Sequence, residues 1–310
     1  MSLMRRVFLA GAESAWLRGR AMRAPFVRRS VSRFMPGETM DDALEAARQI
    51  EAQQGTGALL THLGENLSSL AEAEAVTGHY LRLIDRVREG RLDSQVSVKL
   101  TQLGLDLGAA ECLENVRRLV EHAERAGSMV WIDMESSPYV DPTLDIFRRL
   151  RERTPRVGVC LQAYLRRTPS DLDTLLPVGA AIRLVKGAYR EPPAVAFPKK
   201  ADVDEQYFRL ARRLLDPSLP QGTFLGIATH DERLIERLRT TAAAGGADPA
   251  RYEHEMLYGI QRPLQAKLTH EGERLRILIS YGEYWFPWFM RRLAERPANA
   301  FFVARNLLRG

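Results

Sequence analysis

Residues 96–134 read VSVKLTQLGLDLGAAECLENVRRLVEHAERAGSMVWIDM and contain one repeating unit of the fold. VSVKL (96–100) and SMVWIDM (128–134) are short apolar runs with β-branched and aromatic residues, which favour buried strands. Between them, AAECLENVRRLVEHAERAG (109–127) has apolar residues at helical spacing and ends at a glycine, which is typical of an amphipathic helix. The stretch therefore predicts a strand, a helix and a second strand.

The same alternation continues on both sides of this stretch. The other apolar runs with strand character are TGALLTHLG (56–64), VGVCLQA (157–163), AAIRLVKG (180–187), TFLGIAT (223–229), YEHEML (252–257) and RLRILIS (274–280). Eight such strands separated by helices predict an α/β protein with a TIM-like (βα)8 barrel. A doubly wound open sheet would give the same alternation, but no GxGxxG follows the first strand, which argues against its dinucleotide-binding form.

Both ends of the chain extend beyond the eight units. Residues 1–55 precede the first predicted strand, and MDDALEAARQIEAQQG (40–55) has helical character, starting at a capping Thr39 or Asp41. The tail after the eighth strand is predicted to be helical too. We therefore expect an N-terminal helical arm over 1–55 and a catalytic barrel over 56–310, with a C-terminal helix over the barrel mouth.

Composition and cysteine usage are those of an ordinary globular protein. Hydrophobic residues make up 45% of the chain and charged residues 27%, which excludes disordered and fibrous classes. Cys112 lies in a helical pattern and Cys160 in an apolar run, so we predict two buried free thiols and a reducing, intracellular compartment.

The positive charge is concentrated at the N-terminus. The 310 residues have a net charge of +6, yet residues 1–37 alone hold eight arginines and one acid, Glu13. The other 273 residues carry 37 bases and 38 acids, a net −1. An arm that binds nucleic acid is one interpretation, although few aromatic residues interleave with these arginines. No run reaches the roughly 18 apolar residues of a membrane-spanning helix, and Glu13 and Arg18 interrupt the apolar run that a secretory signal needs.

Polar side chains stand at the ends of the predicted strands, where the loops of such a barrel form its active site. In chain order they are Glu65, Lys99, Asp133, Gln162, Arg183, Lys186, Thr229, His230, Glu253 and Glu255. Only five residues of the chain are lysines, and Lys99 and Lys186 both lie in strand runs. Because a lone buried charge is costly, we predict an ion pair between Lys99 and Asp133.

Two adjacent arginines, Arg291 and Arg292, follow the aromatic run YWFPWF (284–289). Two guanidinium groups can clamp a carboxylate bidentately, so this cationic mouth indicates an anionic substrate and an electron-rich cofactor. The strand ends contain no HxH pair, and we predict no metal site. A Schiff-base aldolase is an alternative, because Lys99 or Lys186 could act as its nucleophile.

Seven strings carry a resemblance to a known family: SVKLTQLG, WIDMESS, GVCLQAYLRRT, RLVKGAY, ATHD, EHEMLYGI and YGEYWFPWFMRRLAERPAN. Together they resemble flavin-dependent proline dehydrogenase in its short monofunctional bacterial form. The resemblance implies a distorted barrel that binds FAD and oxidises L-proline to 1-pyrroline-5-carboxylate by hydride transfer to the flavin, the first step of proline catabolism to glutamate. Electrons would pass to a membrane quinone, with 1-pyrroline-5-carboxylate dehydrogenase as a downstream partner.

The resemblance also implies a role for each site residue. Catalysis would rest on Asp133 and Arg183. The substrate would meet Lys99, Arg291, Arg292 and Leu257, with Glu65 as a gate that pairs with Arg291. The FAD would be contacted by Met134, Gln162, Arg183, Val185, Lys186, Gly187, Thr229 and His230.

Two further expectations follow from the resemblance. Leu278 stands where many family members have a tyrosine on the last strand, which leaves substrate packing and discrimination against hydroxyproline open. Because a quinone lies in the bilayer, we expect a cytoplasmic protein whose basic arm, residues 1–37, contacts the anionic inner face of the cell membrane, and no nucleic-acid partner.

Overall fold

The structure is a computed structural model that describes residues 31–64 and 67–286. Within these residues, eight parallel strands form a closed barrel in which each strand pairs with its neighbours in sequence and β1 pairs with β8. The strands are β1 Gly57–His62, β2 Ser94–Val98, β3 Val130–Ile132, β4 Val157–Gln162, β5 Ala181–Val185, β6 Phe224–Ala228, β7 Tyr252–Leu257 and β8 Leu275–Tyr281. The predicted (βα)8 barrel is confirmed.

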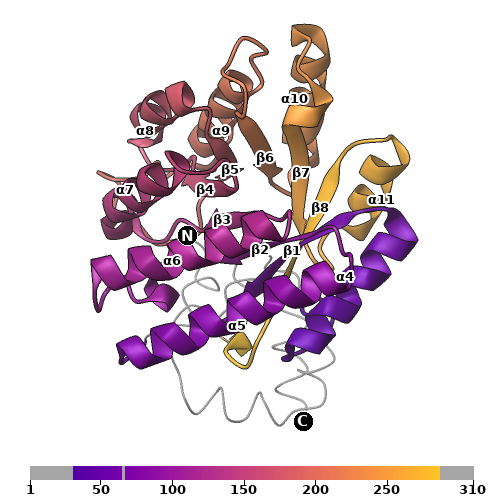
Figure 1. The fold of residues 1–310 in the computed structure, drawn as a ribbon. Helices are drawn as coiled ribbons and strands as arrows, with labels where there is room; N and C mark the ends of the chain where they lie inside the picture. Colours follow the sequence, from indigo (N-terminus) through magenta and orange to yellow (C-terminus); the bar gives the residue numbers. More distant parts are fainter. Residues whose placement is uncertain (1–30, 65–66, 287–310) are drawn as a thin grey trace, which may run out of the picture.

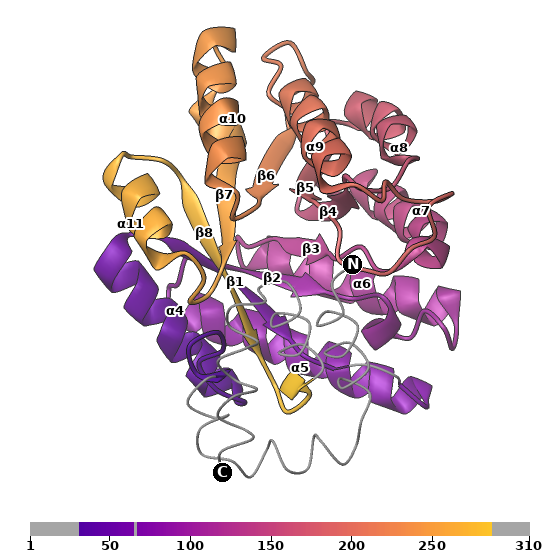
Figure 2. The same ribbon diagram turned by 180° about the vertical axis from the view of Figure 1, so that it is seen from behind.

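Helices surround this barrel, as the two opposite views show (Figures 1 and 2). The α-helices of the described part are α4 Met40–Gln54, α5 Leu70–Glu89, α6 Ala109–Arg125, α7 Val140–Arg151, α8 Thr168–Leu175, α9 Lys200–Leu214, α10 Glu232–Gly245 and α11 Arg262–His270. Short 3-10 turns lie between them at η1 Thr101–Leu103, η2 Ser137–Tyr139, η3 Leu176–Val178 and η4 Pro249–Arg251.

Local sequence signals set the helix ends. Thr39 caps α4: its side chain accepts from the Asp42 backbone N–H, and the Asp42 carboxylate accepts from the Thr39 N–H. This reciprocal capping box satisfies two backbone donors that the helix cannot pair internally. Helix α6 ends at Arg125, two residues before the predicted bound, and Gly127 then adopts a left-handed φ of 71°.

The two faces of the barrel wall differ in chemistry. On β2, Val96 and Val98 point outward and join the main apolar core beneath the helices, whereas Ser97 between them bonds to charged side chains inside the barrel. Inside, a separate apolar cluster consists of Leu59, Trp131 and Ala181, which come from β1, β3 and β5. Side chains of alternate strands therefore form layers in the barrel interior, as in other barrels of this type.

The parts of the chain outside the barrel are described only partly. Helix α4, which belongs to the predicted arm, packs against β1 and β8. Residues 1–30 of the arm and 287–310 of the predicted C-terminal helix lie outside the described residues, and the division at residue 55 stays a prediction. Cys112 and Cys160 are buried free thiols, as predicted.

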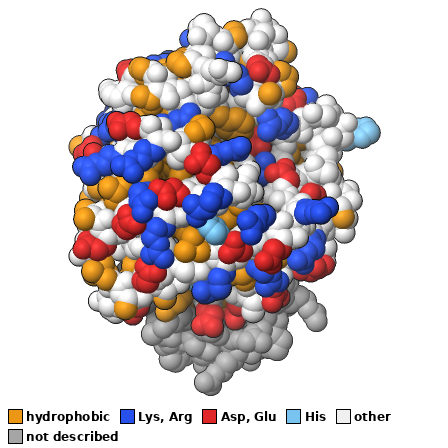
Figure 3. Space-filling view, viewed as in Figure 1, with side chains coloured by type: hydrophobic (Ala, Val, Ile, Leu, Met, Phe, Trp, Pro, Cys, Tyr) orange, Lys and Arg blue, Asp and Glu red, His pale blue; other side chains and the backbone are white. Residues whose placement is uncertain are grey.

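The described surface is mixed in charge. Figure 3 shows Lys and Arg side chains interspersed with Asp and Glu side chains on the described part of the visible face. This agrees with the near neutrality calculated for the chain beyond the arm. No helix within 31–64 or 67–286 is long and apolar enough to cross a membrane.

Candidate active site at the carboxyl ends of the strands

The centre of the site is Arg183, which points into the barrel from β5. Its Nε donates to Glu255 Oε2 at 2.6 Å, and its Nη1 donates to Asp133 Oδ1 and to Ser97 Oγ, both at 2.9 Å. The guanidinium carbon lies 4.7 Å from the centroid of the Trp131 ring, within the range of a cation–π contact. The cation that the structure places against Asp133 is thus Arg183, whereas the sequence predicted Lys99.

In this cluster, burial and the neighbouring charges have opposite effects on the pKa values of Arg183 and Glu255. Arg183 and Glu255 are 2% and 4% exposed. Burial acts to lower the pKa of Arg183, but Glu255 and Asp133 raise it, so the guanidinium stays charged. Burial raises the pKa of Glu255, although the neighbouring Arg183 acts to lower it. One cation is therefore held between two carboxylates in a region of low dielectric constant.

Several buried polar atoms of this region have no partner among the described residues, and two of them lie on adjacent strands. Arg183 Nη2 and Gln162 Oε1 are both buried and make no hydrogen bond there. Gln162 ends β4, and its Nε2 donates to the backbone oxygens of Met134 at 3.1 Å and of Glu135 at 2.7 Å. A buried donor and acceptor without partners are costly. Because both stand on inward faces of adjacent strands, they fit a flat group with polar edges, such as the ring system of a flavin.

Just after β5, the backbone at Gly187 packs closely against Tyr164. Gly187 has a φ of 115°, and a Cβ at this position would lie 2.1 Å from the Tyr164 ring. Only glycine meets both conditions without strain. The segment after β5 therefore approaches its neighbours closely, as the glycine of a cofactor cradle does.

Lys186 is held in an ion-pair cluster that the sequence did not predict. Its Nζ lies 2.5 Å from Asp204 Oδ1 and 2.8 Å from Asp231 Oδ2, and Lys200 contacts the same two carboxylates. Burial opposes the ionisation of Asp231, but bonds from Lys186 and Lys200 lower its pKa from 3.8 to about 2. The cluster ties the end of β5 to the starts of α9 and α10.

The ends of β6 and β7 are joined through His230. The backbone N–H of Leu257 donates to His230 Nε2 at 2.9 Å, so this ring nitrogen is an acceptor and carries no proton. Thr229 Oγ1 accepts from the backbone N–H of Asp231 at 3.2 Å. Leu257 is in register with Leu278 on β8, which itself packs against the apolar cluster inside the barrel. Leu278 thus borders the position predicted to line the substrate pocket.

Lys99 is half-buried just after β2, at the same end of the barrel. It acts electrostatically on Glu135, whose carboxylate accepts from the backbone N–H of Thr101 at 3.2 Å and from its hydroxyl at 2.8 Å. Burial raises the pKa of Glu135, and Thr101 and Lys99 act to lower it. The loop after β3 is thereby fixed next to the lysine.

The predicted site residues separate into two groups. The structure places a first group within or directly after strands β2 to β7: Lys99, Asp133, Met134, Gln162, Arg183, Val185, Lys186, Gly187, Thr229, His230 and Leu257. Glu65, Arg291 and Arg292 lie outside the described residues, so the predicted clamp and gate stay predictions. No group of three His, Cys, Asp or Glu that could hold a metal ion occurs in 31–64 or 67–286.

Sequence reasoning gave no role to several residues that complete the site. Ser97 and Glu255 hold Arg183, while Asp204 and Asp231 hold Lys186. The available signal for Glu255 was its place in YEHEML, where two acids with a spacing of two interrupt a strand. Two acids on one strand face must both be buried, and each then needs a cation.

Comparison with known proteins identifies relatives that match most of the chain. The sequence profile of proline dehydrogenase matches residues 43–305. The chain is 38% identical over 280 residues to proline dehydrogenase 2 of Bacillus subtilis (strain 168), covering 90% of this chain and 91% of that protein. It is also 38% identical over 287 residues to a proline dehydrogenase of Deinococcus radiodurans, covering 90% of each.

Solved structures share the fold. The proline utilization A protein of Bdellovibrio bacteriovorus, inactivated by N-propargylglycine, superposes with a TM-score of 0.81 at 23% identity. The match covers 94% of this chain but 36% of that protein, so the present chain spans about a third of its length. This likeness concerns the fold alone.

Proposed function

The chain belongs to the proline dehydrogenase family, and we propose that it oxidises L-proline to 1-pyrroline-5-carboxylate with FAD as its redox cofactor. The observation that supports the proposal most directly is the pair of buried polar atoms without partners, Arg183 Nη2 and Gln162 Oε1. They supply a charged donor and an acceptor at the end of the barrel where such enzymes bind their ligands.

The residues present fit a bound flavin. Gln162 and Arg183 would contact its ring, and Met134 would pack beside it. The backbone at Gly187, together with Val185, Lys186, Thr229 and His230, would hold the remainder of the cofactor. When bound, FAD supplies the hydride acceptor. Arg183 would stabilise the negative charge that arrives there, because a prearranged cation costs no reorganisation during the reaction.

The substrate carboxylate would be bound by cations at the mouth. Lys99, Arg291 and Arg292 would hold it, and Asp133 would support this cluster while it keeps Arg183 in place. Leu257, fixed by His230, would line the pocket on the opposite side. Such a clamp orients the ring carbon beside the nitrogen for hydride loss. Glu65 would close over the bound substrate by pairing with Arg291.

The electrons would leave through a membrane quinone, and the product would pass to 1-pyrroline-5-carboxylate dehydrogenase on the route to glutamate. We assign contact with the anionic membrane surface to the arginines of residues 1–37, with the protein otherwise in the cytoplasm. Cosedimentation with vesicles containing phosphatidylserine checks this: replacing Arg5, Arg6, Arg18 and Arg20 by Gln should weaken binding strongly, and undiminished binding would place the contact elsewhere.

The enzymatic proposal is tested by Arg291→Met with Arg212→Met as control, since Arg212 is exposed on α9. Loss of a charge-assisted hydrogen bond of roughly 1.5 to 3 kcal/mol should raise the KM for L-proline about 10- to 100-fold in an assay with an artificial quinone. FAD content should stay at the wild-type level in both variants. A wild-type protein that takes up no FAD, or an unchanged KM in Arg291→Met, would contradict the proposal.

A further inference from the structure

Glu255 is a buried carboxylate that has no role in the proposed reaction. It points into the barrel from β7, where its Oε2 accepts from Arg183 Nε at 2.6 Å. Its Oε1 is buried and has no partner within the described ranges. A carboxylate left half satisfied in the barrel interior is costly, so a structural role alone does not account for it.

The contact with Glu255 completes the fixation of Arg183. Glu255 holds Nε, Asp133 and Ser97 hold Nη1, and the Trp131 ring lies against the guanidinium. Bonds at two different nitrogens fix both the plane and the rotation of this planar group. Nη2 is then the one guanidinium nitrogen left without a partner in the described part of the chain.

The strand between Arg183 and Glu255 leaves space for the carboxylate. Gly226 on β6 is in register with Arg183, and a Cβ there would lie 2.2 Å from Glu255 Oε1. Gly226 does not have a positive φ, so its backbone does not require glycine. The glycine at this position is explained by the room that the Glu255 side chain needs.

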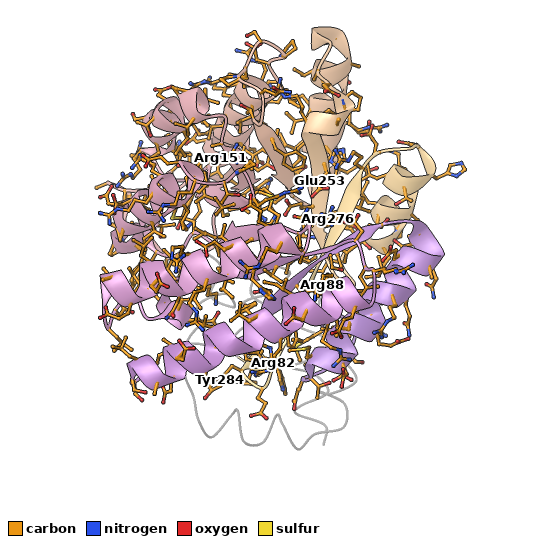
Figure 4. All side chains as sticks on the ribbon, in the orientation of Figure 1. Arg82, Arg88, Arg151, Glu253, Arg276 and Tyr284 are labelled. Carbon is orange, nitrogen blue, oxygen red and sulfur yellow. The ribbon has the colours of Figure 1, made fainter. Side chains whose placement is uncertain are left out.

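The second ion pair of the interior acts on Glu255 in two opposing ways: Glu253 raises the pKa of Glu255 and Arg276 lowers it. Glu253, two residues earlier, pairs with Arg276 of β8 at 2.8 Å, and Arg276 also contacts Asp93 at 3.0 Å. Figure 4 shows Glu253 and Arg276 next to one another at β7 and β8. Among the described residues, Arg183 is the cation in direct contact with Glu255, and it contacts the carboxylate of Asp133 as well.

We propose that Glu255 is a positioning residue that fixes Arg183 with Nη2 free for the flavin and offsets part of its positive charge, so that it sets the flavin reduction potential. This inference rests on the proposed function, because it takes Arg183 as the neighbour of the flavin. With the negative charge of Glu255 nearby, transfer of a hydride to the flavin would be less favourable than it would be beside Arg183 alone. Its hydrogen bond keeps the guanidinium in place.

The charge is tested with Glu255→Gln, which retains an acceptor for Arg183 Nε but removes the charge. Redox titration of the FAD-loaded protein at pH 8 should show a midpoint potential that is more positive than in the wild type. Glu253→Gln is the matched control: it removes the same charge from the same strand at a residue that pairs with Arg276 instead, and should shift the potential less.

The orientation is tested with Gly226→Ala, which keeps every charge and displaces the Glu255 carboxylate. The kcat for L-proline should fall on the order of tenfold or more with KM unchanged, because Arg183 moves while the carboxylate clamp does not. This inference alone would be overturned if FAD binds and is reduced by proline but the midpoint potential does not shift in Glu255→Gln. An equal shift of the midpoint potential in Glu253→Gln would overturn it in the same way. A wild-type protein without FAD would overturn the proposed function and this inference with it.

Discussion

Arg183 Nη1 lies 2.9 Å from Asp133 Oδ1, so that the middle of β5 is bonded to the end of β3 across the interior of the barrel. Asp133, Arg183 and Glu255 come from the third, fifth and seventh strand units. They form a charged layer above the apolar one of Leu59, Trp131 and Ala181. The chemistry of the site therefore depends on the same alternation that fills the barrel.

Removal of the central cation should destabilise the fold strongly. Arg183→Met leaves Glu255 buried without a partner, which should lower the free energy of unfolding by about 3 to 5 kcal/mol. The double variant Arg183→Met/Glu255→Gln should recover a large part of this loss, because the uncompensated charge is gone. Urea unfolding of the two proteins measures the difference, and equal stabilities would show that Glu255 is not a charged partner of Arg183.

The cluster around Lys186 predicts a stability that depends on pH. The pKa of Asp231 is lowered in the folded protein to about 2, so the group stabilises the fold above pH 3.8, and this stabilisation is lost as the pH falls toward 2. Asp231→Asn should therefore lower the free energy of unfolding at pH 7 by at most about 2 kcal/mol. The difference from wild type should shrink between pH 4 and pH 2. A difference that is constant over this range would contradict the assignment.

Gly187 should not tolerate a side chain. Gly187→Ala combines a φ of 115° with a Cβ 2.1 Å from the Tyr164 ring, so it should displace the chain after β5 and reduce FAD retention. Gly245→Ala is the control, because Gly245 ends α10 with no atom within 4 Å of an added Cβ. The control should be more stable than wild type by up to about 1 kcal/mol. Equal FAD content in the two variants would contradict the cradle.

Leu278 should determine how well the pocket separates proline from hydroxyproline. Its register with Leu257 places it beside the proposed substrate, and a tyrosine there would reduce the space for a ring hydroxyl. Leu278→Tyr should raise the ratio of kcat/KM for L-proline over 4-hydroxyproline about tenfold. Leu278→Phe, which introduces the ring without its hydroxyl group, shows whether the size of the tyrosine ring alone accounts for the change. An unchanged ratio in both variants would place Leu278 away from the substrate.

The fold could be predicted from the sequence because its signals are local. YEHEML has the same bounds, 252–257, in the sequence prediction and in β7. SMVWIDM (128–134) was predicted too long, because Val130–Ile132 alone pair with the neighbouring strands and the flanking residues turn into loops. Apolar periodicity identifies a strand, whereas the neighbouring strands decide how much of it is paired.

The partners inside the site could not be predicted in the same way. Lys99 and Asp133 follow adjacent strands, which suggested an ion pair, but Asp133 accepts instead from Arg183 of β5 and from Ser97 of β2. Barrel closure brings inward side chains of β5 near those of β3, and no local sequence pattern shows which inward side chain will be met there. Lys186 likewise meets two aspartates whose distance in the sequence, 18 and 45 residues, carries no signal of proximity. Motif resemblance suggested roles for these residues, and the tertiary structure determined their contacts.

Hydride transfer from L-proline to a bound flavin, as proposed for this protein, can be followed by visible absorption. The spectrum of the purified protein is recorded without oxygen, before and after addition of L-proline, with D-proline as control. We expect a yellow protein whose flavin absorption is bleached by L-proline and retained with D-proline. A colourless protein that takes up no FAD, or a flavin that L-proline does not bleach, would show that the protein is not a flavin-dependent proline dehydrogenase.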